Sequence, residues 1–374
     1  MRVLELFSGY GTASFALKRL GISYELVGYS DVDRFANECF KMNHCPDDIN
    51  DELRLGDVTK VDPYELEDFD LLTGGFPCQS FSTAGKGLGE LDPRGSLFYE
   101  IIRIAEVKKP RFMLLENVKG LTGKKFKGTF DKILSELRRI GYVVFWKVLN
   151  SKDFGVPQNR ERVWFVCFRK DVEHSFEFPK EKELTIFLKD ILEDSVDNKY
   201  YLSEKQLIKL KEYIGKKNKI NAEVINCIGT CFGRSGCSKE ELESFARTNK
   251  ALMIGNLTRY KMKSERSMPF KEDGVSWALT GNCDVGVLDI YNNKLEKDGI
   301  CITLTDPHHN NLRVHDGLSI RKLTPKECFR LMGFFDDEIK LDGLSDTQRY
   351  KLAGNGQDVN VVCLLFKEMF KELF

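Results

Sequence analysis

Short apolar runs alternate with amphipathic stretches through the first half of the chain. The apolar runs have the length and composition of buried strands, and they lie at residues 2–7, 24–30, 69–75, 111–118, 142–149 and 162–169. Helical spacing of apolar residues lies between them at 12–21, 96–108 and 128–140. This alternation predicts an α/β fold with a doubly wound, mostly parallel sheet. Such a sheet binds its ligands at the carboxyl ends of its strands.

The pattern changes after about residue 195. Residues 200–320 hold Gly, Asn, Ser and Lys clusters with short strand-like pieces such as "GVSWALTG" and "GICITLT". Helical periodicity returns at 321–334 and continues to the C-terminus. We therefore expect two domains, one formed by residues 1–195 with 320–374, and a smaller, irregular, strand-rich one formed by 196–319.

Composition limits the class of protein. The chain has 374 residues, of which 42% are hydrophobic and 30% charged, as in soluble globular proteins. It has no apolar run long enough to span a membrane and no convincing signal peptide, so we expect a cytoplasmic protein. Its eleven cysteines include no CxxC pair, which argues against disulfides. Cys227, Cys231 and Cys237 fit no common zinc spacing, so no metal is expected.

The charge is unevenly distributed although the net charge is zero. Residues 1–70 carry 7 basic and 15 acidic side chains, a net charge of −8. Residues 201–275 carry 15 basic and 9 acidic side chains, a net charge of +6. A basic segment of this kind suits a polyanionic partner, although a solvated charged face would look the same.

The first strand ends in a glycine-containing turn, "FSGYGT". Gly9 and Gly11 let the backbone approach a ligand at the start of the following helix, but the third glycine of the dinucleotide fingerprint is missing. Asp31 and Asp57 follow later apolar runs, where carboxylates could accept from ribose hydroxyls and from an adenine amino group. The three features together favour a cofactor that contains a nucleoside.

Two reactive side chains follow neighbouring strands. Cys78, in "GGFPCQSFS", comes just after a predicted central strand, where it could be a nucleophile or a structural cysteine. Glu116, in "LLENV", ends the next strand and has no basic neighbour in sequence. It could therefore be protonated and act as a general acid, or serve as a cap or a salt-bridge partner.

The stretch "PQNRERV" enters the last predicted strand of the first half. Gln158, Arg160 and Arg162 occupy alternate positions, which places all three on one face of a strand. Two guanidinium groups on one face suit recognition of a phosphate or a base.

The order of these motifs resembles that of the DNA cytosine-5 methyltransferase family. The resemblance covers residues 1–170 and 320–365 and rests on "FSGYG", "SDVD", "GDV", "GGFPCQSFS", "RGSLFYE", "LLENV", "PQNRERV", "RKLTPKECFRLMGF" and "LAGNGQDVNVV". The segment without a match lies where this family carries its target recognition domain. The resemblance implies the class I methyltransferase fold and S-adenosylmethionine as the cofactor.

The resemblance also implies a covalent mechanism. The Cys78 thiolate would add to C6 of a cytosine while Glu116 donates a proton to N3, and C5 would then attack the methyl group of S-adenosylmethionine. Arg162 and Arg160 would hold the base and offset developing negative charge. Because a cytosine inside a duplex cannot be reached, the base would have to be flipped out.

The cofactor residues follow from the same comparison. Phe7 would stack on adenine, Gly9 and Gly11 would form the turn, Asp31 would bind ribose and Asp57 the adenine amino group. Glu5 would lie near the methionine end, and Asn355 would brace the first motif. The family usually has Ser where this chain has Gly356, and Glu is commoner at the position of Asp31.

Double-stranded DNA is the implied partner, with contacts expected from Gln79, Ser82 and Gln158. A companion restriction endonuclease is left open, and we expect a monomer that does not bind membranes. Three alternatives remain: a tRNA methyltransferase of the same fold, an inactive DNA-binding relative, and a metal-dependent enzyme. The long basic segment and the lack of a Cys-Phe-Thr triplet count against the first.

Overall fold

The computed structural model describes residues 1–76, 97–202 and 321–371 in full, together with the backbone of short strands between residues 286 and 320. The chain divides into two compact units. The first contains Met1–Thr185, Thr303–Pro307 and Phe329–Phe374, and the second contains Ile186–Ile302 and His308–Cys328.

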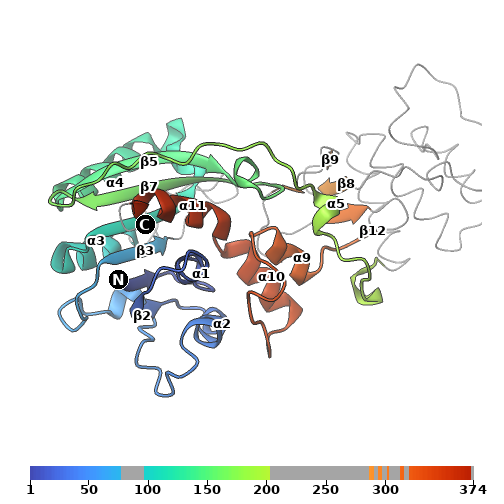
Figure 1. Cartoon of the computed structure of the whole chain (residues 1–374), viewed down its shortest axis with the longest axis horizontal. Coiled ribbons are helices and arrows are strands. Elements are labelled where there is room, and N and C mark those ends of the chain that lie inside the picture. The colour runs from blue at the N-terminus through green and yellow to red at the C-terminus, as the bar shows by residue number, and fades with distance from the viewer. Residues whose placement is uncertain are drawn as a thin grey trace, which may run out of the picture. The chain divides into compact units, whose positions relative to one another are not determined.

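A six-stranded sheet forms the centre of the first unit (Figure 1). Its order is β2 (Glu25–Ser30), β1 (Arg2–Leu6), β3 (Leu71–Gly75), β4 (Phe112–Val118), β7 (Glu161–Arg169) and β5 (Tyr142–Asn150). The first four strands are parallel, and β7 runs antiparallel to both β4 and β5. The doubly wound, mostly parallel sheet expected from the apolar runs is confirmed, with each strand within two residues of its predicted ends.

Helices cover both faces of this sheet. α3 (Leu97–Lys108) and α4 (Lys127–Arg139) share a buried cluster with Leu4, Leu72 and Met113. α1 (Thr12–Arg19) packs against α11 (Val359–Met369), whose neighbour Phe370 contacts Phe112 of β4. Leu4, Leu72 and Met113 thus point to the face of the sheet that α3 and α4 cover. Because side chains alternate along a strand, the residues next to them in β1 and β4 point to the opposite face, which carries α1 and α11, and β7 alternates in the same way.

Shorter elements connect these layers. α2 (Arg34–His44) follows β2 and stacks Phe40 on Tyr29, with ring centroids 4.1 Å apart. α9 (Pro325–Arg330) and α10 (Asp346–Asn355) precede α11. The remaining elements of this unit are the 3₁₀ helices η1 (Val58–Lys60), η4 (Lys119–Thr122), η5 (Lys124–Phe126) and η6 (Ser151–Phe154), and strand β6 (Gln158–Asn159).

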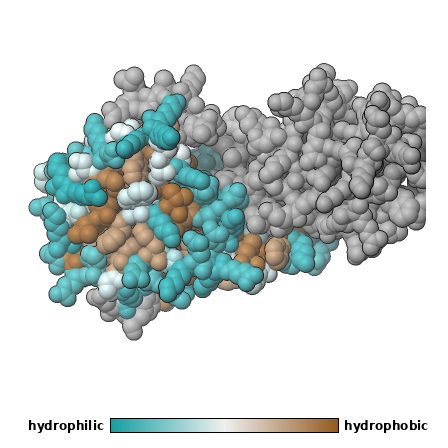
Figure 2. Space-filling view, turned by 90° about the horizontal axis from the view of Figure 1, so that it is seen from above, coloured by the Kyte–Doolittle hydropathy of each residue, from teal (hydrophilic) through white to brown (hydrophobic). Residues whose placement is uncertain are grey.

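The surface of the first unit is mixed in character. Strand β5 is an outer strand of the sheet and leaves Val143 and Trp146 36% and 43% exposed. Figure 2 shows hydrophobic residues gathered on the face seen from above, with hydrophilic residues around them. Among the helices that the structure describes, none combines the length and the apolar character needed to span a membrane.

The second unit is described only in part. Its antiparallel sheet has the order β12 (Ile320–Arg321), β11 (Leu312–His315), β8 (Gly286–Asp289) and β9 (Lys294–Glu296), and it also contains β10 (Cys301–Ile302). α5 (Leu188–Ile191) and η7 (Asn198–Tyr200) precede these strands. Near its end, Arg321 and Glu327 form a buried 2.7 Å ion pair. The expected strand at "GICITLT" overlaps β10, and "GVSWALTG" lies outside the described residues.

Candidate active site

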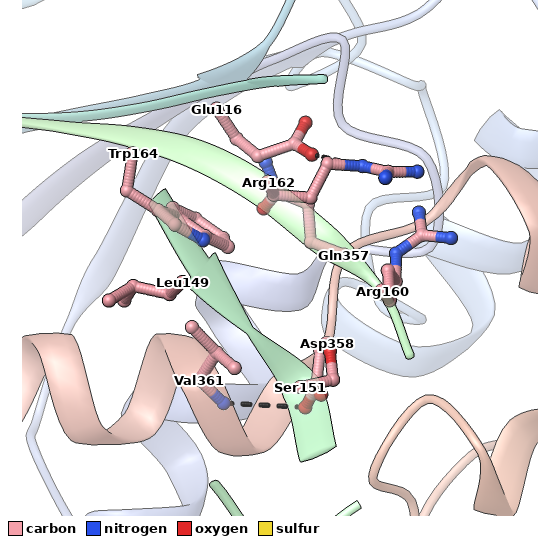
Figure 3. A pocket seen from close by; sticks show the side chains of 9 residues that line it. All are labelled: Glu116, Leu149, Ser151, Arg160, Arg162, Trp164, Gln357, Asp358 and Val361. Atoms are coloured by element: carbon pink, nitrogen blue, oxygen red, sulfur yellow. Dashed lines mark hydrogen bonds and ion pairs between the residues drawn. The ribbon is translucent and has the colours of Figure 1, made fainter. Parts of the chain in front are cut away.

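Glu116 and Arg162 form an ion pair between two neighbouring strands. The Nε of Arg162 lies 2.8 Å from Oε1 of Glu116, and both side chains are largely buried. In the β4–β7 register Glu116 faces Trp164 and Val118 faces Arg162, so both charged residues lie on the face that carries α11. Figure 3 shows the carboxyl and guanidinium groups turned toward each other. Sequence order hid this basic partner because 46 positions separate the two residues.

A pocket lies around this pair (Figure 3). Its apolar side comes from Leu149, Trp164 and Val361, and its polar side from Arg160, Gln357 and Asp358 in addition to the ion pair. Gly75 borders the same region, because a Cβ on it would lie 2.9 Å from Nε2 of Gln357 and 3.3 Å from Oε2 of Glu116. The end of β3 therefore needs glycine to leave room for these two side chains.

Arg160 is buried and holds the C-terminal part of the unit. Its guanidinium donates to the carbonyl oxygens of Gly354, at 3.3 and 3.4 Å, and of Gly356, at 2.6 Å. Burial, followed by the charge of Arg162, lowers the pKa of the Arg160 guanidinium from its usual range. The structure thus places Arg160 in the lining of the pocket, where its guanidinium binds two backbone carbonyl oxygens.

The first glycine turn is fixed by contacts from β2 and α2. Phe7, Gly9 and Gly11 have φ of 52°, 56° and 83°, the region that favours glycine. The Gly9 amide donates to Oδ2 of Asp31 at 3.0 Å, and the amide of Asp33 donates to Oδ1 at 2.8 Å. Burial raises the pKa of Asp31. A Cβ on Gly9 would meet nothing within 4 Å, so space is open above the turn.

Glu5 lies beneath this turn on the α1 face of β1. It is 3% exposed and accepts hydrogen bonds from the amide of Ser14, at 3.0 Å, and from the Ser14 hydroxyl. Burial raises its pKa to about 7. The carboxyl therefore ties β1 to α1.

Asp57 and Asn355 differ in their contacts. Oδ1 of Asp57 accepts from the amide of Thr59 at 3.0 Å and caps η1, which lowers the pKa of this carboxyl. Asn355 is exposed at the end of α10, and among the described residues no hydrogen bond joins its side chain to the first motif. The contact to that motif comes two residues later, where the Tyr10 hydroxyl donates to the Gln357 carbonyl.

Gln158 is fully buried on β6. Neither atom of its side-chain amide has a hydrogen-bond partner among the described residues. A buried amide without partners is costly, so such groups usually serve a contact or hold a water molecule.

Several expected residues lie outside the described part of the chain. They are Cys78, Gln79 and Ser82, and also Cys227, Cys231 and Cys237. Phe76, two positions before Cys78, is the last described residue at the end of β3. Within the described ranges, no group of three or more His, Cys, Asp or Glu residues is arranged to hold a metal ion.

Sequence reasoning did not single out Tyr10, Gln357 and His44. Nε2 of His44 lies 2.9 Å from the Tyr10 carbonyl oxygen, and its ring lies where a Cβ on Gly11 would be. For Tyr10 and Gln357 the available signal was position, since each stands inside a motif that the sequence did identify. His44 gave no such signal.

A sheet of this order with helices on both faces, and a carboxylate at the tip of a central strand, defines a methyltransferase-like α/β domain. The family model of C-5 cytosine-specific DNA methylases matches residues 1–371, and the chain belongs to that family. It is accordingly a DNA cytosine-5 methyltransferase.

Relatives match along the whole chain. The orphan methyltransferase M.SPRI of Bacillus phage SPR is 32% identical, over 99% of this chain and 97% of its own length. The type II methyltransferase M.SsoII of Shigella sonnei is 33% identical, over 100% of this chain and 80% of its own. Among solved structures, S. pombe Dnmt2 methyltransferase shares the fold with a TM-score of 0.59 at 20% identity, covering 100% of this chain and 99% of that one.

Proposed function

We propose that the protein methylates C5 of a flipped-out cytosine in a specific DNA sequence, with S-adenosylmethionine as the methyl donor and Cys78 as the covalent nucleophile. The observation that carries the residue assignment is the Glu116–Arg162 ion pair, 2.8 Å long, which lines a pocket beside the end of β3. Cys78 is two positions beyond the last described residue of that strand end.

Cys78, Glu116 and Arg162 have separate roles in this reaction. The thiolate of Cys78 adds to C6 as Glu116, in its protonated form, gives a proton to N3, which places electron density on C5. Bound S-adenosylmethionine supplies an electrophilic methyl group to C5. The C5 proton is then lost to water as the C6–S bond breaks, which returns the free thiolate, and N3 gives its proton back to Glu116. Arg162 lies where it can exchange part of its contact with Glu116 for the carbonyl oxygen of the base.

The methyl donor fits the region around the first turn. The open space above Gly9, the Asp31 carboxylate at its edge and the N-terminus of α1 suit a ligand with a nucleoside and a cationic sulfur. We assign Phe7, Gly9, Gly11, Asp31 and Asp57 to this site. Asn355, which is exposed at the end of α10, is assigned to the same site.

DNA contacts are assigned to Gln79, Ser82 and Gln158, and target recognition to the domain formed by residues 196–319. The buried, unpartnered amide of Gln158 supports its part in a polar contact. The relatives include both orphan and type II methyltransferases, so the proposed activity does not depend on a partner restriction endonuclease.

A trapping experiment tests the proposal. Duplex DNA that contains 5-fluorocytosine in place of cytosine is incubated with the protein and S-adenosylmethionine, and a covalent adduct that withstands denaturation is expected. Cys78→Ser should form no adduct. An undiminished adduct in that variant, or methyl label that passes from the cofactor to tRNA and never to DNA, would overturn the proposal.

A further inference from the structure

Tyr10 connects the first glycine turn to the pocket around Glu116. It stands between Gly9 and Gly11, is fully buried, and packs edge-on against Phe329 and Phe334, with ring centroids 5.7 and 5.2 Å away. Its hydroxyl donates to the carbonyl oxygen of Gln357. A residue of the turn thus reaches the connection between α10 and α11, which consists of Gly356, Gln357 and Asp358.

Gly356 is a glycine for reasons of space and not of backbone conformation. Its φ of −72° and ψ of 175° are open to any residue. A Cβ on Gly356, however, would overlap the Cε1, Cζ and hydroxyl oxygen of Tyr10. Any side chain at position 356 therefore competes with the far end of the tyrosine ring for the same volume.

The α10–α11 connection also reaches the pocket around the Glu116–Arg162 ion pair. The carbonyl oxygen of Gly356 accepts from Arg160 at 2.6 Å, and the side chain of Gln357 lies beside Gly75 next to the Glu116 carboxyl. Both Arg160 and Gln357 line the pocket (Figure 3). A movement of this connection would displace a wall of the pocket and the polar surroundings of Glu116.

We propose that Tyr10 is a positioning residue that fixes the α10–α11 connection against the pocket, and that Tyr10 and Gly356 form a compensating pair in which the ring occupies the volume of a side chain at 356. This inference rests on the proposed function, because it assigns the pocket to the target base. It explains within this chain why a glycine stands where the family usually has a serine: the hydroxyl of Tyr10 fills that place.

A double-mutant cycle tests the pair by thermal unfolding without substrate. Gly356→Ala should lower the melting temperature by about 5 °C in the natural chain. In a Tyr10→Leu background, which lacks the overlapping atoms, the same change should lower it by about 1 °C or less. Gly128→Ala is the matched control, since a Cβ there meets nothing within 4 Å. An equal loss from Gly356→Ala in both backgrounds would overturn the pairing.

Kinetics of Tyr10→Phe test the positioning role. This variant keeps the ring and loses the donor to Gln357, so kcat for methyl transfer should fall about tenfold while KM for S-adenosylmethionine stays within about twofold. A kcat equal to that of the natural protein, with only the melting temperature lowered, would reduce Tyr10 to a packing residue. The unfolding cycle needs no activity. The melting temperatures would therefore still test the Tyr10–Gly356 pair if the protein failed the trapping experiment.

Discussion

The guanidinium of Arg162 and the carboxyl of Glu116 meet at 2.8 Å across antiparallel strands β7 and β4, on the face of the sheet that carries α11. The pairing follows from register, since Arg162 lies opposite Val118 and so two positions from the residue that faces Glu116. It gives the pocket a fixed donor and a fixed carboxyl on adjacent strands.

Replacing Arg162 by lysine should lower kcat by about a hundredfold and leave the fold intact. Lysine keeps the charge but loses the planar fork that can contact a carboxylate and a base oxygen together. Arg139→Lys is the control, because Arg139 forms a comparable 2.7 Å pair with Glu106 at an exposed site. Methyl transfer to DNA under single-turnover conditions gives the comparison. Equal rates for both variants would separate Arg162 from the chemistry.

Asp31→Asn should weaken binding of S-adenosylmethionine at least tenfold and destabilise the first turn by about 1–2 kcal/mol. An asparagine retains one acceptor oxygen, while both oxygens of Asp31 accept from backbone amides. Asp33→Asn serves as the control, since the side chain of Asp33 caps α2 and pairs with Lys351. Calorimetric titration with the cofactor measures both variants, and similar affinities would contradict the assignment of Asp31.

Gln158→Leu should leave the melting temperature unchanged or slightly raised, because it removes an amide that has no partner among the described residues. The same change should raise the Kd for specific duplex DNA about tenfold if that amide contacts DNA. Fluorescence anisotropy with a labelled duplex measures the affinity. Unaltered DNA affinity would leave the amide without a role in binding.

Acid should destabilise the first unit through His44. Burial lowers the pKa of this imidazole from 6.5 to about 3, so the folded protein holds it neutral while the unfolded chain protonates it. Its contribution to stability is complete above about pH 6.5 and is lost progressively as pH falls toward 3. We expect His44→Gln to flatten the fall in melting temperature between pH 7 and pH 4.5. An unchanged pH profile would show that folding does not lower the pKa of His44.

Glu5 should act in the opposite direction. Its pKa is raised from 4.5 to about 7, so its contribution is complete below about pH 4.5 and is lost as pH rises through 7. Glu5→Gln removes the cost of a buried negative charge and keeps an oxygen that can accept from the Ser14 amide. At pH 8 this variant should be more stable than the natural protein by roughly 2–3 kcal/mol, as measured by urea unfolding. Lower stability at pH 8 would contradict the burial argument.

Periodicity predicted the sheet well because each strand is an apolar run bounded by turns, as "RVLEL" and "FMLLENV" illustrate. It also placed Glu116 at the end of one predicted strand and Arg162 at the start of another. It could not predict their ion pair, since that depends on which strand lies beside β4 and in which direction it runs. The contacts of Arg160 with the carbonyl oxygens of Gly354 and Gly356 were equally hidden.

Tyr10 illustrates the same difficulty within a motif. Its neighbours Gly9 and Gly11 were conspicuous because glycine has a conformational meaning in sequence, whereas a tyrosine between them has none until its ring is seen against Gly356. Volume competition between residues 346 positions apart leaves no mark on periodicity or spacing.

The walls of the pocket are drawn from parts of the polypeptide that are far apart in sequence, from Glu116 to Val361. A chain emerging from the ribosome therefore carries its cofactor turn and its glutamate long before Gln357 and α11 are available to close the space around them. The pocket is closed only once these residues are in place, so a chain terminated shortly before α11 would have an open, unfinished pocket.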